Sequence, residues 1–259
     1  MTMFPTPPIP SSHESRPSRF AGLRAGPLGK TVAGVAALVL VAVAIGTIVG
    51  MATRETLRFQ YVAVAGEDMM NQQLLIDYDG GSPVTPTLSF TAYDGAGHSL
   101  PKVRVRTMFG SDHGALVILP GGGFDVLIFD GPSADQVADV KVTVDDAPTV
   151  RFPLVESFVD VTPLDREGAT VTRNDRIASV EVTNPNGLPV TVRLVYVVWN
   201  DPEPGKTQQA ETVTPVGGLI TVPGDDSVTV RMSGPADAAN GKAVARNRPA
   251  SIKAYFTTV

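Results

Sequence analysis

Histidines are the side chains of this chain best suited to catalysis or metal binding, and there are three of them. His98 lies in a Gly-rich turn four residues after Asp94, His113 follows a Ser-Asp pair in a second turn, and His13 precedes a long apolar segment. A Ser-His-Asp set can be drawn from these turns, but no nucleophile elbow or oxyanion loop accompanies it. Because polar residues are common in β-turns without any function, we expect no catalytic residue and no enzyme activity.

Metal and cofactor chemistry has equally little support in the sequence. The chain has no cysteine, which excludes disulfides, thiolate zinc sites, iron–sulfur clusters and a thiol nucleophile. Aspartates in turns, such as Asp77, Asp79 and Asp94, offer oxygen ligands for calcium, but no D-x-D-x-D-G loop is present. The glycines at 121–123 lack the Lys-Ser/Thr of a phosphate loop. We expect no metal site and no cofactor, and leave calcium binding open.

Trp199, the only tryptophan, ends a run that is apolar on both faces of an expected strand. Strand alternation directs Trp199 away from the core that Tyr196 and Val198 would face. Three interpretations are open: an exposed aromatic platform, a contact between sheets, or a contact between domains. If the face is exposed, Trp199 together with Val195 and Val197 forms the candidate binding patch.

Residues 31–52 form an uncharged apolar segment of the length that a membrane-spanning helix needs, about 20 residues. Basic residues dominate the preceding tail, which predicts a cytoplasmic N-terminus and an extracytoplasmic C-terminus. The tail, residues 1–30, is rich in Pro and Ser and is expected to be disordered. A cleaved signal peptide ending at Ala52 is the alternative, although its apolar core would be unusually long.

From residue 53 onward the hydrophobic pattern changes to a period of two, which is typical of half-buried β-strands. The alternation is clear at 103–107, 124–129, 140–145 and 227–232. Gly, Pro, Asn and Asp clusters separate these runs, as in sandwiches of short strands. No long amphipathic helix is evident, and the segment Ser133–Val137 predicts one helical turn capped by Ser133.

An internal repeat relates the two parts of this β region. Residues 74–94 align without gaps on residues 180–200, and residues 118–129 align on 221–232. The identical pairs of the first block are Gly81/Gly187, Pro83/Pro189, Val84/Val190, Thr85/Thr191 and Leu88/Leu194. A register that changes only in loops is typical of duplicated domains. We expect β-sandwich domains at 53–158 and 159–259, joined without a flexible linker.

Turn residues fit this division. Asn184-Pro185-Asn186-Gly187 matches a type I turn and is expected to join two adjacent strands, as is its counterpart at 78–81. The Pro-Gly pairs at 120–121 and 223–224 mark a second shared turn. Greek-key and meander connections are both compatible with these lengths.

A family resemblance follows from short motifs in the two repeats. Phe90-Thr91-Ala92-Tyr93-Asp94 resembles the F-x-L-y-D signature of FxLyD domains of bacterial envelope proteins, with Ala92 in the place of Leu. The N-P-N turn at 184–186 is similar to that of water-stress (late-embryogenesis-type) β-sandwich domains. Both families resemble immunoglobulin-like sandwiches. The resemblance implies an extracytoplasmic module and carries no catalytic site.

Together these patterns predict an all-β ectodomain of two tandem immunoglobulin-like β-sandwiches, preceded by one transmembrane helix and a disordered tail. The expected function is non-enzymatic: a single-pass protein of the cell membrane that presents its sandwiches to an envelope protein or to a second copy of itself. A ligand- or glycan-binding module is the alternative. The net charge of −5 argues against nucleic acid as a partner.

Overall fold

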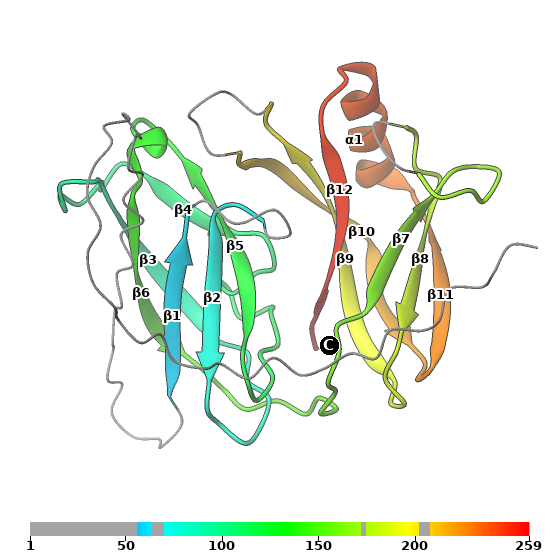
Figure 1. Ribbon diagram of the computed structural model, residues 1–259, viewed down its shortest axis with the longest axis horizontal. Helices are drawn as coiled ribbons and strands as arrows, with labels where there is room; N and C mark the ends of the chain where they lie inside the picture. The colour runs from blue at the N-terminus through cyan, green and yellow to red at the C-terminus, as the bar shows by residue number, and fades with distance from the viewer. Residues whose placement is uncertain (1–55, 64–69, 172–174, 202–207, 259) are drawn as a thin grey trace, which may run out of the picture. The chain divides into compact units, whose positions relative to one another are not determined.

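A computed structural model describes residues 56–63, 70–171, 175–201 and 208–258, which are mostly β-strand with one α-helix (Figure 1). The strands are β1 (Leu57–Val62), β2 (Gln73–Tyr78), β3 (Thr87–Tyr93), β4 (Arg104–Thr107), β5 (Gly123–Asp130), β6 (Asp139–Asp146), β7 (Asp160–Leu164), β8 (Ser179–Asn184), β9 (Val190–Trp199), β10 (Ala210–Val222), β11 (Asp226–Arg231) and β12 (Ala250–Phe256). The helical segments are the 3-10 turn η1 (Ala134–Gln136) and the α-helix α1 (Gly234–Ala245).

Strands β1 to β6 form two sheets around a common core. One sheet has the order β1-β2-β5-β4, and the other pairs β3 with β6, all neighbours being antiparallel. Leu74 of β2 and Val126 of β5 belong to the same buried cluster as Leu88 of β3 and Val142 of β6. The apolar faces of the two sheets therefore cover each other, as binary patterning requires.

Strands β7 to β12 likewise form two sheets around a core, with three strands in each. One sheet has the order β11-β8-β7 and the other has the order β10-β9-β12. Val180 and Val182 of β8 share a buried cluster with Val192 and Leu194 of β9 and with Ile252 of β12. Each half of the chain thus has its own core between two antiparallel sheets.

The period-two pattern correctly predicts strands at the four places where it is clearest. The runs at 103–107, 124–129, 140–145 and 227–232 coincide with β4, β5, β6 and β11. In β6, Val140 and Val142 are buried whereas Lys141 and Thr143 are exposed. Side chains of a strand point alternately to its two faces, so one face of β6 supplies the core and the other meets solvent.

The internal repeat of the sequence is also present in the positions and pairing of the strands. Strands β2 and β8 begin 106 positions apart, at Gln73 and Ser179. The β3–β6 pair Leu88↔Val144 has its counterpart in the β9–β12 pair Leu194↔Ala254. The two copies therefore share the register of their inner strand pair as well as its sequence pattern.

Two turns differ from the expectations, and the first of them, at 78–81, leads from β2 to β3, which lie in different sheets. The turn at 184–187 joins β8 to β9, which lie in different sheets, so the prediction that it links two adjacent strands is wrong. Asn184 explains the geometry: its side-chain amide donates to the carbonyl oxygens of Leu188 (2.9 Å) and Pro223 (2.9 Å), and its Oδ1 accepts from the backbone N–H of Asn186 (3.1 Å). The turn is thus held by side-chain hydrogen bonds and not by strand pairing.

The fourth strand of each copy joins a different sheet. In the first half β4 pairs with β5, whereas in the second half β10 pairs with β9. Strand β10 is longer than β4, and its pairing with β9 shifts register between Val216 and Leu219, where two glycines intervene. The copies consequently expose different edges, which matters for the site described below.

Helical structure occurs where β5 leads to β6 and where β11 leads to β12. The expected turn near Ser133 is present as η1, but Ser133 has φ 73° and makes no side-chain cap hydrogen bond, so the predicted cap is wrong. Helix α1 buries Ala236, Asn240 and Ala243. These small and polar residues give no apolar stripe of the kind that reveals a helix in a sequence.

None of the helices in the described ranges is long and apolar enough to cross a bilayer. The segment expected to span the membrane, residues 31–52, and the expected tail, residues 1–30, lie outside the described residues.

Candidate binding site

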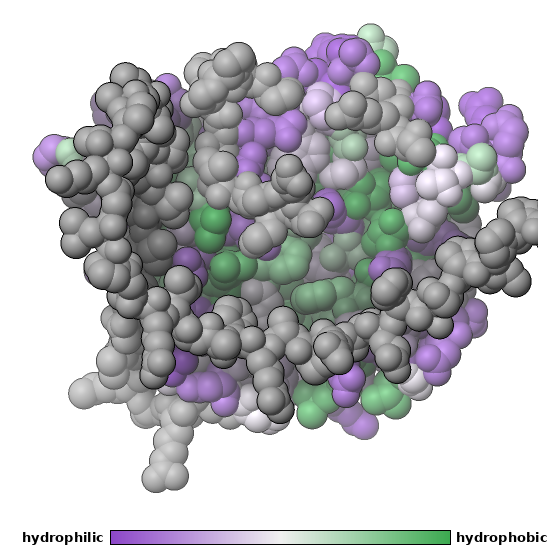
Figure 2. Space-filling model, in the orientation of Figure 1, coloured by the Kyte–Doolittle hydropathy of each residue, from purple (hydrophilic) through white to green (hydrophobic). Residues whose placement is uncertain are grey.

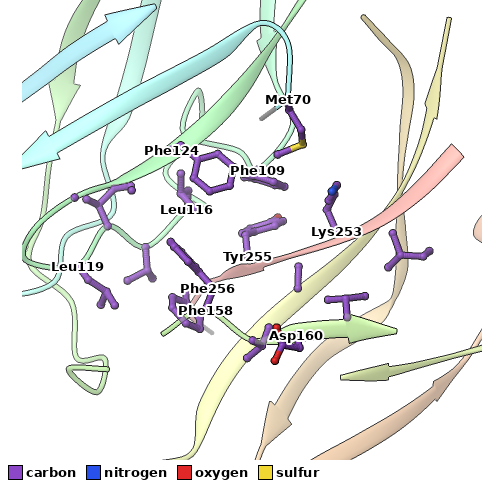
Figure 3. A pocket seen from close by; sticks show the side chains of 18 residues that line it. Met70, Phe109, Leu116, Leu119, Phe124, Phe158, Asp160, Lys253, Tyr255 and Phe256 are labelled. Carbon is purple, nitrogen blue, oxygen red and sulfur yellow. The ribbon is translucent and has the colours of Figure 1, made fainter. Parts of the chain in front are cut away.

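A cleft of about 310 Å³ lies where the two halves meet, within the single compact unit to which all described residues belong (Figure 3). It is bordered by the segment from Leu116 to Leu119 and by the start of β5 in the first half, and by the start of β7 and by β12 in the second half. The volume is at the small end of the range for ligand pockets, roughly 300–1,000 Å³. The lining is mainly apolar, as in most such pockets.

Aromatic rings form one wall of the cleft. Phe109 lies 5.3 Å from Tyr255 and 5.6 Å from Phe124, between ring centroids. Phe158 joins this group from the connector between the halves, 5.9 Å from Phe124 and stacked on Phe256 at 5.6 Å. These spacings are those of favourable ring pairs, and they link residues of both halves into one continuous surface.

Phe158 is the most exposed member of this wall. Its exposed fraction is 57%, which makes it one of three exposed large hydrophobic residues, with Leu154 and Leu188, among those described. Hydrogen bonds between Ser157 and Asn186 hold the connector against the 184–187 turn. In the space-filling view, hydrophobic residues are visible in the middle of the face turned to the viewer, with hydrophilic residues around them (Figure 2). An apolar surface of this kind commonly marks an interaction site.

Lys253 is the cationic residue of the cleft. Its side chain is partly buried, no carboxylate of the described residues lies within 4 Å of it, and burial lowers its pKa. Asp160, at the start of β7, is the acidic residue of the lining and is itself exposed. A partly desolvated ammonium beside apolar walls favours a ligand that brings its own negative charge.

The outer edge of β12 borders the cleft, and its backbone groups can be assigned. The N–H of Trp199 bonds the carbonyl of Pro249 (2.9 Å), and the N–H of Thr257 bonds the carbonyl of Thr191 (3.2 Å). In an antiparallel ladder the bonded pairs alternate, so the odd-numbered residues of β12 bond β9. The N–H and C=O groups of Ile252 and Ala254 therefore point away from β9, toward the outer edge.

One bond from the first half reaches this edge. The N–H of Val117 donates to the carbonyl of Phe256 at 3.0 Å, which fits the alternation because Phe256 belongs to the outward-facing series. Further along β12, in the described part of the chain, no strand pairs with the edge at Ile252 and Ala254. The cleft lies where this contact between the halves ends.

The proposed patch residues Trp199, Val195 and Val197 are found together but are buried. Their exposed fractions are 8%, 2% and 0%, and they share a hydrophobic cluster with the core of the first half. The indole N–H of Trp199 donates to the hydroxyl of Ser251 at 3.0 Å. Of the three interpretations left open above, the contact between the two halves describes this arrangement, and in it these side chains offer no exposed surface.

The histidines are engaged in their own turns. The Nδ1 atom of His98 lies 3.2 Å from Oδ2 of Asp94, and the Nδ1 atom of His113 lies 2.5 Å from Oδ1 of Asp112. His13 is outside the described residues. The hydroxyl of Ser111 is buried and donates to Asp125 rather than to a histidine (2.8 Å). Among the described residues, no three His, Asp or Glu side chains gather as a metal site would require.

Asp125 is a fully buried carboxylate with a structural set of partners. It accepts hydrogen bonds from the backbone N–H groups of Phe109 (2.8 Å), Ser111 (3.0 Å) and Val126 (2.7 Å), in addition to the Ser111 hydroxyl. Burial raises the pKa of Asp125 to about 6, against these hydrogen bonds, which lower it. Asp125 positions the 109–111 loop and hence the Phe109 ring in the cleft.

Sequence reasoning missed the residues that form this site. Phe158 lies in a short connector, and Lys253 and Tyr255 occupy alternating positions of an ordinary strand. Two signals in the sequence could have indicated the site. One is Phe158, an aromatic residue in the connector between the halves, and the other is the strand SIKAYF at 251–256, in which Lys253 and Tyr255 share the face opposite Ile252.

Comparisons of the chain with protein-family models, with curated proteins and with solved structures find no match.

Proposed function

We propose that this chain is a non-enzymatic binding module on the outer side of a membrane, anchored by residues 31–52, which engages an envelope partner through the cleft between its two halves. The observation that carries the proposal is the aromatic cleft, with the half-exposed Phe158 at its entrance. The halves pack through buried residues of β9, which favours a cleft of fixed shape.

The strand order supports immunoglobulin-like sandwiches as the scaffold. In such domains strands A, B, E and D form one sheet and C, F and G form the other. The order β1-β2-β5-β4 with β3-β6 corresponds to A-B-E-D with C-F. In the second half β7, β8 and β11 correspond to A, B and E, and β10 lies beside β9 as strand C′ lies beside C. Such scaffolds commonly serve in recognition, but fold alone assigns no partner.

The location can be tested with a tag placed after Val259 in the full-length chain. If the module lies outside, protease added to intact cells removes the tag, whereas a cytoplasmic marker protein stays protected. Protection of the tag until the membrane is opened would overturn the proposed location.

Binding at the cleft can be tested by photo-crosslinking in the cells that produce the protein. A photoreactive amino acid replaces Phe158 in the full-length chain, and the same amino acid at Thr91, exposed on β3, is the matched control. We expect a reproducible envelope product from position 158 that position 91 does not give. The same products at both positions, or none at position 158, would contradict the proposal.

A further inference from the structure

We propose that the cleft accepts a β-strand: an extended segment of a partner protein pairs with the outer edge of β12 at Ile252 and Ala254, fills the cleft with apolar side chains and brings an acidic side chain to Lys253. This inference rests on the proposed function, because it names the kind of partner that the cleft would bind.

The backbone of β12 supplies the directional part of the argument. The outward N–H and C=O groups of Ile252 and Ala254 lie in the same series as the carbonyl of Phe256, which already accepts a hydrogen bond from Val117. An added strand would continue that contact along the edge. Main-chain hydrogen bonds of this kind give strand addition its affinity, and side-chain pockets give its specificity.

The surroundings of this edge fit a strand that is apolar on both faces. A segment beside β12 would meet Phe109 of the first half on one side and Val161 of β7 on the other, with the contacting rings of Phe124 and Phe158 beside Phe256 at one end of the cleft. Strands covered on both faces have nearly continuous apolar sequences. The partner segment should therefore be rich in Val, Ile or Leu, without the polar alternation of a surface strand.

Lys253 adds a charge requirement to this apolar segment. It lines the cleft, is partly buried and has no acidic partner within 4 Å among the described residues. Asp160 is the acidic residue of the lining and is too far away to form an ion pair with it. An acidic residue within the partner segment would neutralise the ammonium and fix the register of the added strand.

Two other edge strands, β10 and β6, carry features that discourage pairing and that β12 largely lacks. Strand β10, at the opposite edge of the same sheet, contains Pro215 and the irregularity between Val216 and Leu219. Strand β6 ends with the exposed pair Asp145 and Asp146. Proline, bulges and charges are the usual means of blocking an edge, and the stretch from Ile252 to Phe256 contains none of them except Lys253.

The test uses a fluorescent probe peptide, KKVIVEVIVKK, and the full-length protein in lipid nanodiscs. Fluorescence anisotropy should show saturable binding of this probe. Methylation of every backbone nitrogen between the lysine pairs keeps the side chains but removes the donors, and should weaken binding at least tenfold. A probe with Gln in place of Glu should bind at least threefold more weakly, because it brings no negative charge to the partly buried ammonium of Lys253.

Substitutions in β12 test the same edge from the protein side. Ala254→Pro removes an outward N–H but keeps the hydrogen bonds to β9, because edge strands tolerate proline where the N–H points away from the sheet. This variant should bind the probe at least tenfold more weakly. Ala250→Pro, outward-facing but outside the cleft lining, is the matched control and should bind as wild type. Lys253→Gln should weaken the Glu probe to the level of the Gln probe and leave the latter unchanged.

Equal binding of the methylated and unmethylated probes to the wild-type protein would overturn strand addition, and this comparison holds even if Ala254→Pro fails to fold. Unaltered binding by a folded Ala254→Pro variant, or no binding of the probe at all, would overturn it too. Crosslinking from position 158 decides the proposed function separately. A reproducible product there together with failed strand addition would leave the cleft as a binding site of another kind.

Discussion

Replacing Val197 by alanine tests whether the second face of β9 is buried between the two halves. Val197 is fully buried, and with Val195 and Trp199 it belongs to the hydrophobic cluster of the first half although its own strand lies in the second. The sequence allowed the same face to be an exposed aromatic platform. The two arrangements make different predictions for one small change.

The expected cost follows from the burial of the side chain. Alanine lacks two methyl groups of valine, which are worth about 1.6 kcal/mol of transfer free energy at ~0.8 kcal/mol each. The cavity left between the halves adds to this, so the free energy of unfolding should fall by about 2–3 kcal/mol. For a unit of this size, that loss lowers the melting temperature by roughly 4–12 °C. On an exposed platform the change would cost less than about 0.5 kcal/mol.

The assay is thermal unfolding of the full-length protein, followed by circular dichroism and by the fluorescence of Trp199, the only tryptophan. Thr212→Ala is the control, because Thr212 is exposed on the neighbouring strand β10 and should leave the melting temperature within about 2 °C. Wild-type protein should lose its β-sheet signal and its buried tryptophan emission in one transition, since both halves share the cluster around Trp199.

A melting temperature for Val197→Ala within the range of the Thr212→Ala control would refute this reasoning. So would a tryptophan emission maximum that is already solvent-exposed in the folded wild-type protein. Either result would mean that the halves do not pack through β9, and Trp199, Val195 and Val197 would again be the leading candidates for a binding patch.

Three further predictions test local features of the fold. Burial raises the pKa of Asp125 from 3.8 to about 6, so the native state binds this proton more tightly and the free energy of unfolding should fall as pH rises from about 4 to about 6. Asp125→Asn should remove this pH dependence of the free energy of unfolding. If Asp125 instead makes the wild-type protein more stable as pH rises over this range, the hydrogen bonds to the carboxylate outweigh burial. Asn184→Ala leaves buried carbonyl groups without donors and should cost about 2–3 kcal/mol in denaturant unfolding, whereas a loss under 0.5 kcal/mol would contradict this role. Gly121 and Gly122 both have positive φ, but a Cβ at Gly122 would lie 2.1 Å from the Ile76 carbonyl oxygen, whereas none of the described atoms lies near a Cβ at Gly121. Gly122→Ala should therefore lower the melting temperature clearly more than Gly121→Ala. Equal effects would show that backbone strain alone sets the loss of stability.

Much of the fold could be predicted because its strands carry local signals. Alternation such as that of Val140 and Val142 in β6 reports which face is buried, and it requires no knowledge of the partner strand. The constant offset between β2 and β8 likewise survives in the sequence, because both copies need apolar residues at the same core positions. Turn residues such as Asn184 also mark their places, since their side chains bond to nearby backbone.

What could not be predicted depends on contacts between distant segments. No local pattern shows that β10 joins β9 while β4 joins β5, because either sheet accepts a strand with one apolar face. Helix α1 was missed because Ala236 and Ala243 bury little apolar surface. The cleft brings together Phe109, Phe158 and Tyr255, and their neighbourhood follows from how the two halves pack, which no spacing in the sequence records.

The divergence between the two copies explains why a site arises in the second and not at the same place in the first. At the end of β6 that corresponds to Tyr255 and Phe256 of β12, Asp146 lies opposite Thr87 as Tyr255 lies opposite Arg193, and Asp145 lies in the irregularity between Thr87 and Leu88. In the first copy these positions carry exposed charges, which keep an edge in water and free of other strands. In the second copy they carry rings that contribute to the cleft, and the edge beside them faces apolar walls. In a duplicated domain, few substitutions at the end of one strand are thus enough to change a protected edge into one suited for binding. Placing a charge at this end of β12, as in Tyr255→Asp, removes the ring that contacts Phe109 and should abolish binding of the probe peptide.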